Sequence, residues 1–314
     1  MARKSTTSSN GQPVTTSESE VQQNDARPQR GKAKHTTAAS DDSADESDHY
    51  ADPTRGTPMP CDASLYPGGS RSLASIGEQG FFLGAAFATS LGALIWLTHV
   101  FPHTLWRLAS FTGCLSIFHF LEYETTARYN LPTLRASSFL LFTNGKEYNI
   151  AYGLAIVEMV VSYFFPAYQA SFVNEYIIGS GIALVIIGQI VRTTAMVQAG
   201  TNFNHTPANT KREGHVLVTK GVYAWLRHPS YFGFFWWAVG TQLMVGNKVC
   251  LLGYIFVLWH FFSHRIRGKS IFKRRTAWRW LICSTVEEKK LVEFFGADYE
   301  DFRRRTPTGI PLVK

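Results

Sequence analysis

Large hydrophobic side chains are sparse in the first 78 residues of this chain and then gather into six long segments. Residues 1–78 are rich in Ser, Thr, Asp and Gln. A segment of this composition cannot bury enough apolar surface to offset its conformational entropy, so we predict a disordered N-terminal tail. Residues 79–314 are predicted to form a membrane-embedded domain, because apolar runs of about 20 residues can cross a bilayer as helices.

The apolar segments predict an all-α, multi-pass transmembrane fold with about six spans. Glu158 lies inside the third segment, where it is either part of a site or hydrogen-bonded to a neighbouring helix. Gly179, Gly181 and Gly188 in the fourth predict close helix contact. The last two segments are short for independent spans, so we expect one tight helical hairpin. The predicted spans are residues 80–101, 103–121, 148–165, 176–199, 231–245 and 249–262.

Positive charge is distributed unevenly between these spans. Residues 79–314 contain 23 Lys and Arg residues against 12 Asp and Glu. With six spans, the basic loops 128–146 and 211–227 lie on the same side as both termini, whereas the opposite loops contain only Lys248. Cytoplasmic loops carry the excess of Lys and Arg in membrane proteins, so we predict that the basic loops face the cytosol. This pattern fits a membrane protein better than a nucleic-acid-binding protein.

Sequence motifs of several common site types are absent. The four cysteines form no Cys-x-x-Cys pair, so neither a disulfide framework nor a zinc site is indicated. The chain has no Gly-x-Gly-x-x-Gly fingerprint, no P-loop and no Gly-x-Ser-x-Gly elbow. His99/His103 and His260/His264 have i, i+4 spacing, but no carboxylate lies beside either pair. We interpret them as interfacial histidines and predict no metal site.

Residues 200–242 contain the strongest candidate for a functional site. This stretch has three histidines, two basic clusters and the sequence Arg-His-Pro-Ser-Tyr at 227–231, directly before an apolar segment. Ionisable groups at a bilayer boundary are costly, which makes a functional site the default hypothesis. The alternative is the start of a membrane helix with a snorkelling arginine and an interfacial tyrosine, and the stretch alone leaves both open.

Several short motifs follow one another in a defined order along residues 80–314. They are Phe-His-Phe at 118–120, Glu122, Asn-Phe-Asn-His at 202–205, His-Val-Leu-Val at 215–218, Gly-Val-Tyr at 221–223, Arg-His-Pro-Ser-Tyr at 227–231 and the pair Glu287-Glu288. In this order and spacing they resemble the isoprenylcysteine carboxyl methyltransferase family over nearly all of residues 80–314. Arg-His-Pro-x-Tyr alone is shared with related membrane methyltransferases and reductases, whereas the whole set is specific.

The resemblance implies a reaction, ligands and a location. The cofactor would be S-adenosyl-L-methionine, and the substrate the C-terminal prenylcysteine of a farnesylated or geranylgeranylated protein, such as a small GTPase. The enzyme would lie in the endoplasmic reticulum membrane with its active site facing the cytosol. Arg265 matches an arginine that faces the substrate, and we group it with Asn204 and His205 as catalytic. The expected cofactor-binding residues are His215, Val216, Leu217, Val218, Tyr223, His228, Pro229, Ser230, Tyr231 and Glu287.

These residue types suit methyl transfer to a carboxylate. The carboxylate is already ionised at pH 7, so the enzyme needs no general base and must align and desolvate it. Arg265 can orient the carboxylate, Glu287 can accept hydrogen bonds from the cofactor, and Tyr223 and Tyr231 offer rings to a sulfonium. The alternatives are a phospholipid N-methyltransferase, a sterol reductase of related architecture, and a membrane scaffold without activity.

One segment departs from the family pattern. In the family, the acidic pair follows soon after the arginine that Arg265 matches, but here the basic, Trp-containing residues 267–286 intervene. The segment is either an interfacial insertion, since Trp and basic residues suit a membrane surface, or a retained intron, since Gly-Lys-Ser can be encoded by the splice-donor-like string GGTAAGT. We favour the intron, and expect the translated segment to displace Glu287 and reduce activity.

Overall fold

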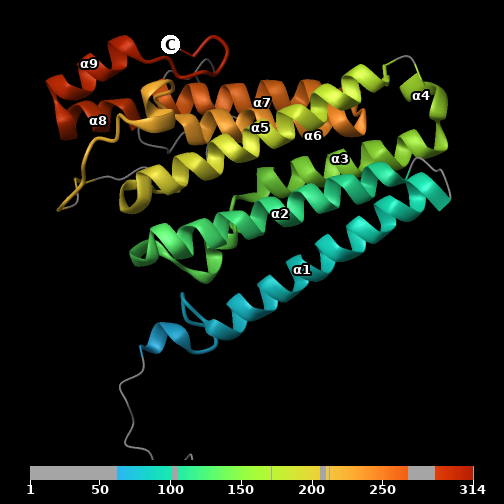
Figure 1. Cartoon of the computed structure of the whole chain (residues 1–314), viewed down its shortest axis with the longest axis horizontal. Coiled ribbons are helices and arrows are strands. Elements are labelled where there is room, and N and C mark those ends of the chain that lie inside the picture. Colours follow the sequence, from blue (N-terminus) through green and yellow to red (C-terminus); the bar gives the residue numbers. More distant parts are fainter. Residues whose placement is uncertain are drawn as a thin grey trace, which may run out of the picture. The chain divides into compact units, whose positions relative to one another are not determined.

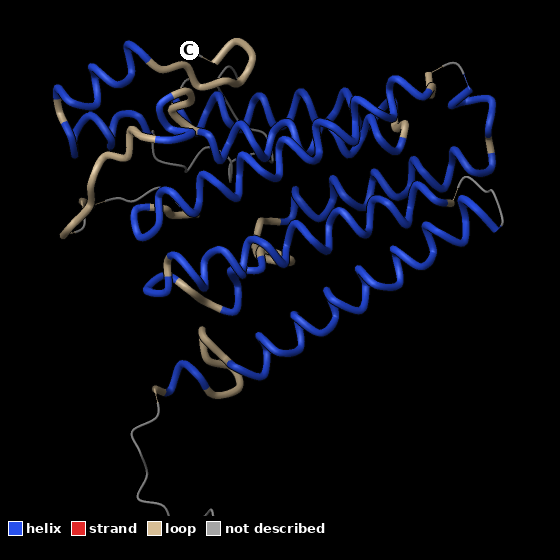
Figure 2. Tube along the Cα trace, viewed as in Figure 1, coloured by secondary structure: helices blue, strands red, loops and turns tan. Residues whose placement is uncertain are grey.

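The computed structural model describes residues 62–100, 105–170, 172–205, 210–211, 213–267 and 287–313. All of these residues belong to one unit, Pro58–Lys314. Helices and the loops that join them make up these ranges, and no strand occurs in them (Figure 2). The prediction of an all-α fold is therefore confirmed for the described part of the chain.

Helix α1 begins earlier than the change from polar to apolar residues predicts. It spans Leu73–Ile95 and continues as a π-helix, Trp96–Val100. The side chain of Ser72 accepts a hydrogen bond from the backbone N–H of Ser75, which caps the helix and sets its start. The domain boundary predicted at residue 78 therefore lies inside α1. Residues 1–61 are outside the described ranges, where disorder stays a prediction.

Each of the six segments predicted as spans forms a helix (Figure 1). Within the described ranges, three helical stretches are long and apolar enough to cross a membrane, namely Leu73–Val100, Glu175–Asn202 and Lys248–Ile266. α2 and α3 contain several charged residues and α6 is short, so the count of six spans stays a prediction. The helices after α1 are α2 (Trp106–Tyr129), α3 (Lys146–Phe164), α4 (Pro166–Ala170), α5 (Glu175–Ala199), α6 (Pro229–Val245), α7 (Lys248–Arg267), α8 (Glu287–Phe295) and α9 (Ala297–Arg305).

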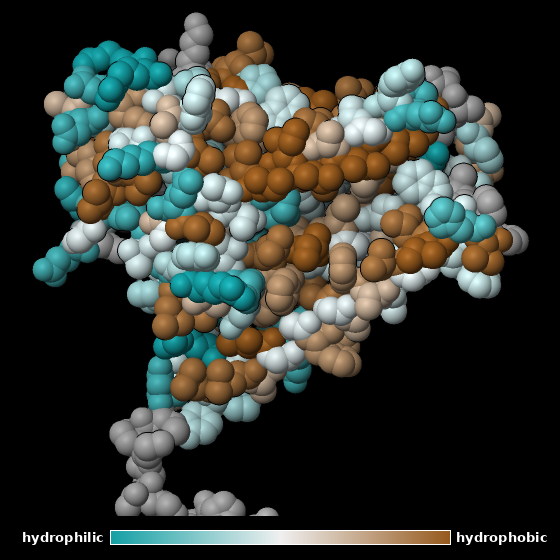
Figure 3. All heavy atoms as spheres, viewed as in Figure 1, coloured by the Kyte–Doolittle hydropathy of each residue, from teal (hydrophilic) through white to brown (hydrophobic). Residues whose placement is uncertain are grey.

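The surface of the bundle is apolar along the long helices. Figure 3 shows hydrophobic side chains in bands along the bundle, whereas hydrophilic residues gather over α8 and α9. Phe81 on α1, Ile150 on α3 and Ile190 on α5 are among the exposed large apolar residues. Soluble proteins rarely expose apolar patches of this extent, so these faces are suited to lipid.

Four glycines bring α5 and α6 into very close contact. Gly188 of α5 lies against Gly233 of α6, and Gly181 of α5 lies against Gly240 of α6. Small residues let helix backbones approach closely in membranes, which confirms the predicted role of Gly181 and Gly188. Gly179, which we expected to share this role, has open space around its Cα and makes no such contact.

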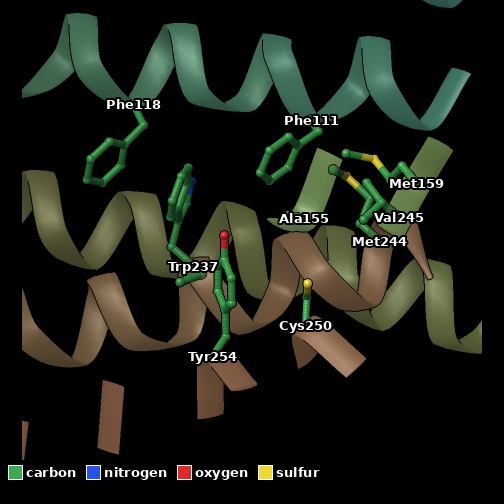
Figure 4. Packing of buried hydrophobic residues seen from close by; sticks show 10 residues of the cluster. Phe111, Phe118, Ala155, Met159, Trp237, Met244, Val245, Cys250 and Tyr254 are labelled. Atoms are coloured by element: carbon green, nitrogen blue, oxygen red, sulfur yellow. The ribbon is translucent and has the colours of Figure 1, made fainter. Parts of the chain in front are cut away.

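Aromatic residues fill the core between these helices (Figure 4). Phe118 of α2 stacks on Trp237 of α6, with 4.3 Å between the ring centroids. Phe111, about two helical turns before Phe118 on α2, packs edge-on against Tyr152 of α3. Stacked and edge-on ring pairs stabilise a core beyond the area that they bury. The core therefore fixes α2 and α3 relative to the α5–α6 pair.

Glu158 of α3 has a structural role at the turn between α6 and α7. Its carboxylate accepts hydrogen bonds from the backbone N–H groups of Val249 at 2.9 Å and Cys250 at 2.7 Å, and from the hydroxyl of Tyr168 at 2.8 Å. These N–H groups belong to the first turn of α7, where the helix itself offers no acceptor. Of the two possibilities that the sequence left open, the structure therefore supports the hydrogen bond to a neighbouring helix.

Glu158→Ala is expected to destabilise the protein by about 1–3 kcal/mol, because buried N–H groups lose their acceptor. Thermal unfolding of the detergent-solubilised protein measures this loss. Glu147→Ala, at an exposed position in the first turn of the same helix, is the matched control and should leave the melting temperature unchanged. Equal melting temperatures for the two variants would contradict the role given to Glu158.

Candidate functional site

A cavity lies where the end of α5, the loop from 202 to 228, the start of α6 and helices α8 and α9 meet. It encloses about 690 Å³ of empty space, open solvent included. All ten residues predicted to bind the cofactor line this cavity, and so does Asn204. The structure thus gathers the predicted set, while the role of each residue stays a prediction. The lining residues that were not predicted to bind a ligand are Ala199, Asn202, Phe203, Arg227, Leu291, Phe295, Tyr299 and Phe302, of which Asn202, Phe203 and Arg227 belong to the motifs named above.

Polar side chains at the end of α5 hold the loop that forms one wall of the cavity. The side-chain oxygen of Asn202 accepts a hydrogen bond from the backbone N–H of Val216 at 2.9 Å. Gln198 accepts one from the backbone N–H of Val222 at 2.8 Å. The loop has no regular structure of its own along most of this wall, so these bonds set the path of its backbone beside α5.

The Arg-His-Pro-Ser-Tyr motif forms the first turn of α6. His228 occupies the N-cap position and Pro229 the first helical position, where its missing N–H costs nothing. The helix turn then places Ser230 and Tyr231 in the cavity wall. The rings of His228 and Tyr231 are stacked, with centroids 5.4 Å apart and an interplanar angle of 11°.

Tyr231 connects the cavity to Arg265, which does not itself line it. The Tyr231 hydroxyl donates a hydrogen bond to Oε2 of Glu287 at 2.5 Å and accepts one from Nε of Arg265 at 2.8 Å. Nη2 of Arg265 donates to the backbone carbonyl of His205 at 2.5 Å. Arg265 and His205 therefore lie just behind the cavity wall, next to the predicted cofactor residues.

The segment between α7 and α8 does not displace Glu287. Residues 268–286 lie outside the described ranges, but Oε2 of Glu287 is only 3.9 Å from Nε of Arg265. The expectation that this segment would move Glu287 out of the site is therefore wrong.

A buried ion pair that sequence reasoning missed lies behind Ser230. Nη2 of Arg192 on α5 donates to Oε2 of Glu122 on α2 at 2.8 Å, and its Nε pairs with the other carboxylate oxygen. Nη1 of Arg192 donates to the hydroxyl of Ser230 at 3.0 Å. Opposite charges within two membrane segments were the available signal, because such residues commonly pair with each other.

Glu288, next to Glu287, connects helices α8 and α9 to the residues at the start of α6. Its carboxylate is buried, 3.1 Å from Nη2 of Arg227, 3.6 Å from Nε2 of His228 and 3.9 Å from Nη1 of Arg303. Burial acts to raise the pKa of Glu288, but the contact with His228 and the charges of Arg227 and Arg303 hold it below its usual value. The carboxylate therefore stays ionised and holds α8 and α9 against the cavity.

Two ionisable groups at the site, His205 and Tyr223, keep their neutral forms. Burial lowers the pKa of His205, so its imidazole is uncharged at pH 7. Burial, together with the charge of Glu287, raises the pKa of Tyr223, which keeps its phenol protonated. Arg265 on α7, behind the cavity wall, is a cation whose recorded carboxylate neighbour, Glu287, lies 3.9 Å from its Nε.

Comparison with known proteins gives a consistent result. The family profile of isoprenylcysteine carboxyl methyltransferase (ICMT) matches residues 181–271. Protein-S-isoprenylcysteine O-methyltransferase from Saccharomyces cerevisiae is 45% identical over 207 residues, which cover 65% of this chain and 79% of the yeast protein. The proteins of the same name from Schizosaccharomyces pombe and Homo sapiens are 38% and 35% identical, over 78% and 75% of this chain and 97% and 72% of their own lengths.

A solved structure extends the likeness to the fold. The eukaryotic intramembrane Ras methyltransferase ICMT superposes with a TM-score of 0.64 at 32% sequence identity, and the match covers 76% of this chain and 77% of that chain. The motifs, the cavity that they line, the sequence relatives and the fold all agree. This chain belongs to the isoprenylcysteine carboxyl methyltransferase family.

Proposed function

We propose that this protein transfers the methyl group of S-adenosyl-L-methionine to the C-terminal prenylcysteine carboxylate of prenylated proteins, small GTPases among them. The observation that carries the proposal is the Tyr231 hydroxyl, which links Arg265 on one side to Glu287 in the cavity wall on the other. A cation for the acceptor carboxylate thus lies one side chain away from the residues predicted to hold the methyl donor. Family relatives named for this reaction add independent support.

The side chains that line the cavity fit the chemical groups of the proposed cofactor. The rings of Tyr223, Phe295 and Tyr299 offer faces to an adenine or a sulfonium. The Glu287 carboxylate accepts one hydrogen bond from Tyr231 and has further lone pairs for hydroxyl or amino donors. When bound, S-adenosyl-L-methionine would supply an electrophilic methyl group.

The two buried arginines near the cavity are not equivalent as carboxylate receptors. Arg192 already forms two contacts with Glu122 and two with Ser230, so its charge is compensated. Arg265 bonds mainly to neutral acceptors, the Tyr231 hydroxyl and the His205 carbonyl. We therefore assign Arg265 the task of orienting the acceptor carboxylate. This carboxylate is itself the nucleophile that would attack the methyl group. The neighbouring helices would exclude water from the reacting pair.

The proposal includes a location and a topology. The chain would cross the endoplasmic reticulum membrane six times, with the cavity on the cytosolic side. The hydrophilic surface over α8 and α9, at the same end as the basic loop that lines the cavity, supports this orientation (Figure 3). Prenylated substrates also lie in the bilayer by their lipid, so the acceptor carboxylate can reach Arg265 from the membrane side.

Arg265→Ala is expected to raise KM for N-acetyl-S-farnesylcysteine about tenfold to a hundredfold, because a charge-assisted hydrogen bond is lost. His228→Ala is expected to raise KM for S-adenosyl-L-methionine instead. Both KM values are measured with membranes that contain the enzyme, from the transfer of radiolabelled methyl groups to N-acetyl-S-farnesylcysteine. Arg304→Ala, an exposed residue of α9 paired with Asp301, is the control and should change neither value.

The same assay tests the function against its alternatives. Phosphatidylethanolamine and a sterol replace the prenylcysteine as acceptors in parallel reactions. Methyl transfer to the phospholipid, with none to the prenylcysteine, would refute the proposed function. If Arg265→Ala and His228→Ala both change KM for the same ligand only, the assignment of roles is wrong even though the reaction is right.

A further inference from the structure

A second hollow in the structure is lined mainly by residues of α1 and α2, with Ile182 of α5 and Met244 of α6. Its lining residues on α1 and α2 come from the second half of α1 and the first half of α2, and these parts of the helices lie away from α8 and α9 (Figure 1). This groove has about 1340 Å³ of empty space, open solvent included, and shares no lining residue with the cofactor cavity. Its walls are apolar over most of their area. Among the residues that line it are Leu91, Leu94, Ile95, Trp106, Ala109 and Ile117.

Polar groups are concentrated at one end of the groove. Thr98 and His99 on the extension of α1 line this end, and Ser110 lines it from α2. Arg107 stands beside it, with its guanidinium carbon 5.7 Å from the centroid of the Trp106 ring, which is itself part of the groove wall. The groove therefore has mostly apolar walls, and Arg107, although it is not itself a lining residue, lies next to Trp106 of that wall.

Arg107 has no counter-charge among the described residues. Its Nε and Nη1 atoms are buried without a hydrogen-bond acceptor. This sets it apart from Arg192 on α5, whose charge is compensated by Glu122. An unpaired cation within a membrane domain is costly, and an anion that reaches the third nitrogen, Nη2, would reduce that cost.

We propose that the groove binds one glycerophospholipid, with an acyl chain between α1 and α2 and the phosphate on Arg107. An arginine binds phosphate through strong, charge-assisted hydrogen bonds, and the apolar walls match a hydrocarbon chain. The groove also lies along Leu73–Val100, a stretch long and apolar enough to cross a membrane, where phospholipid is the surrounding solvent. The site would hold a resident lipid rather than a reactant.

The prenyl chain of a substrate is a poorer match for this groove. Its carboxylate must reach Arg265, near the cofactor cavity, whereas Arg107 and the groove lie toward the other end of α2 from Glu122, which contacts that site through Arg192. A prenylcysteine also carries no phosphate. The proposed lipid site is therefore separate from the active site, and it does not depend on the proposed reaction.

Native mass spectrometry and thermal unfolding of the purified full chain in detergent test the proposal. The probe is dioleoylphosphatidylcholine, and dioleoylglycerol, with the same two chains and no phosphate, is the matched ligand control. We expect one phospholipid adduct and a raised melting temperature with the phospholipid but not with the diacylglycerol. Arg107→Gln should bind the phospholipid about tenfold more weakly, whereas Arg128→Gln, an exposed residue of the same helix paired with Glu124, should bind it normally.

The stability of Arg107→Gln without lipid supplies a second readout. Removing an unpaired charge should leave the delipidated variant at least as stable as the parent chain, while the added phospholipid should stabilise only the parent. Ala109→Phe, which fills the groove, should abolish the adduct. Equal phospholipid binding by the parent and Arg107→Gln would overturn the proposal. So would displacement of the phospholipid by N-acetyl-S-farnesylcysteine, or a lipid-free dimer in which the grooves cover each other.

Discussion

Gly188→Ala should lose at least about 3 kcal/mol of stability, and Gly188→Leu should yield no folded enzyme. A Cβ atom at Gly188 would lie 2.6 Å from the carbonyl oxygen of Gly233 and 2.6 Å from the backbone nitrogen of Trp237. Both obstacles are backbone atoms, so no rotamer change can relieve the clash. α5 and α6 would separate, and the first turn of α6, which lines the cofactor cavity, would move with them.

The same helix provides the control for this experiment. A Cβ atom at Gly179 would meet no atom within 4 Å, so Gly179→Ala should be neutral or slightly stabilising, since alanine favours helix. Size-exclusion profiles and melting temperatures in detergent distinguish the two substitutions. If Gly188→Ala melts at the temperature of Gly179→Ala, the α5–α6 contact is looser than the structure indicates.

Glu122→Ala should lower stability by about 3–5 kcal/mol, because it leaves Arg192 charged and unpaired in the bundle. The substitution should also reduce methyl transfer, since Arg192 holds Ser230 in the cavity wall. The loss is measured by thermal unfolding and by the radiolabelled methyl-transfer assay. The neighbouring Glu124 forms an exposed pair with Arg128, so Glu124→Ala should cost less than about 1 kcal/mol.

A double substitution separates the two consequences of losing this pair. Replacing both Glu122 and Arg192 by leucine removes the buried charges together, which should restore much of the stability. Activity should remain low, because Ser230 still lacks its hydrogen-bond donor. Full recovery of activity in the double variant would show that the ion pair stabilises the bundle without positioning the site.

The predicted cofactor-binding residues were assigned by their resemblance to the family motifs, and most of them are close together in the sequence. The described residues between Asn202 and Tyr231 lie in one connection and one helix turn, so their order along the chain already places them near each other. The pairing of Glu122 with Arg192 could not be derived in this way. The two residues are 70 positions apart, and whether they meet depends on how α2 and α5 rotate about their axes. Packing of Phe118 against Trp237 sets that rotation, and hydropathy does not report it.

Helix ends were predicted less well than helix positions. The apolar run that predicted the second span ends at residue 121, yet α2 continues to Tyr129. Thr125 and Thr126 lie in this extra part and are buried, so the helix continues where burial, rather than hydrophobicity, supports it. The aromatic wall supplied by Phe295 and Phe302 was missed for another reason. An amphipathic pattern shows that a helix has an apolar face, but not which surface that face covers.

The position of α8 and α9 in the chain affects when the enzyme becomes competent during synthesis. These helices contribute Glu287, Leu291, Phe295, Tyr299 and Phe302 to the cavity wall. A ribosome that has translated α1 to α7 has delivered each long apolar helix of the described ranges to the membrane, but the nascent chain still lacks this wall. Membrane insertion and completion of the cavity are therefore separate events. A messenger truncated between the codons of Arg267 and Glu287 would give an embedded protein whose cavity lacks this wall.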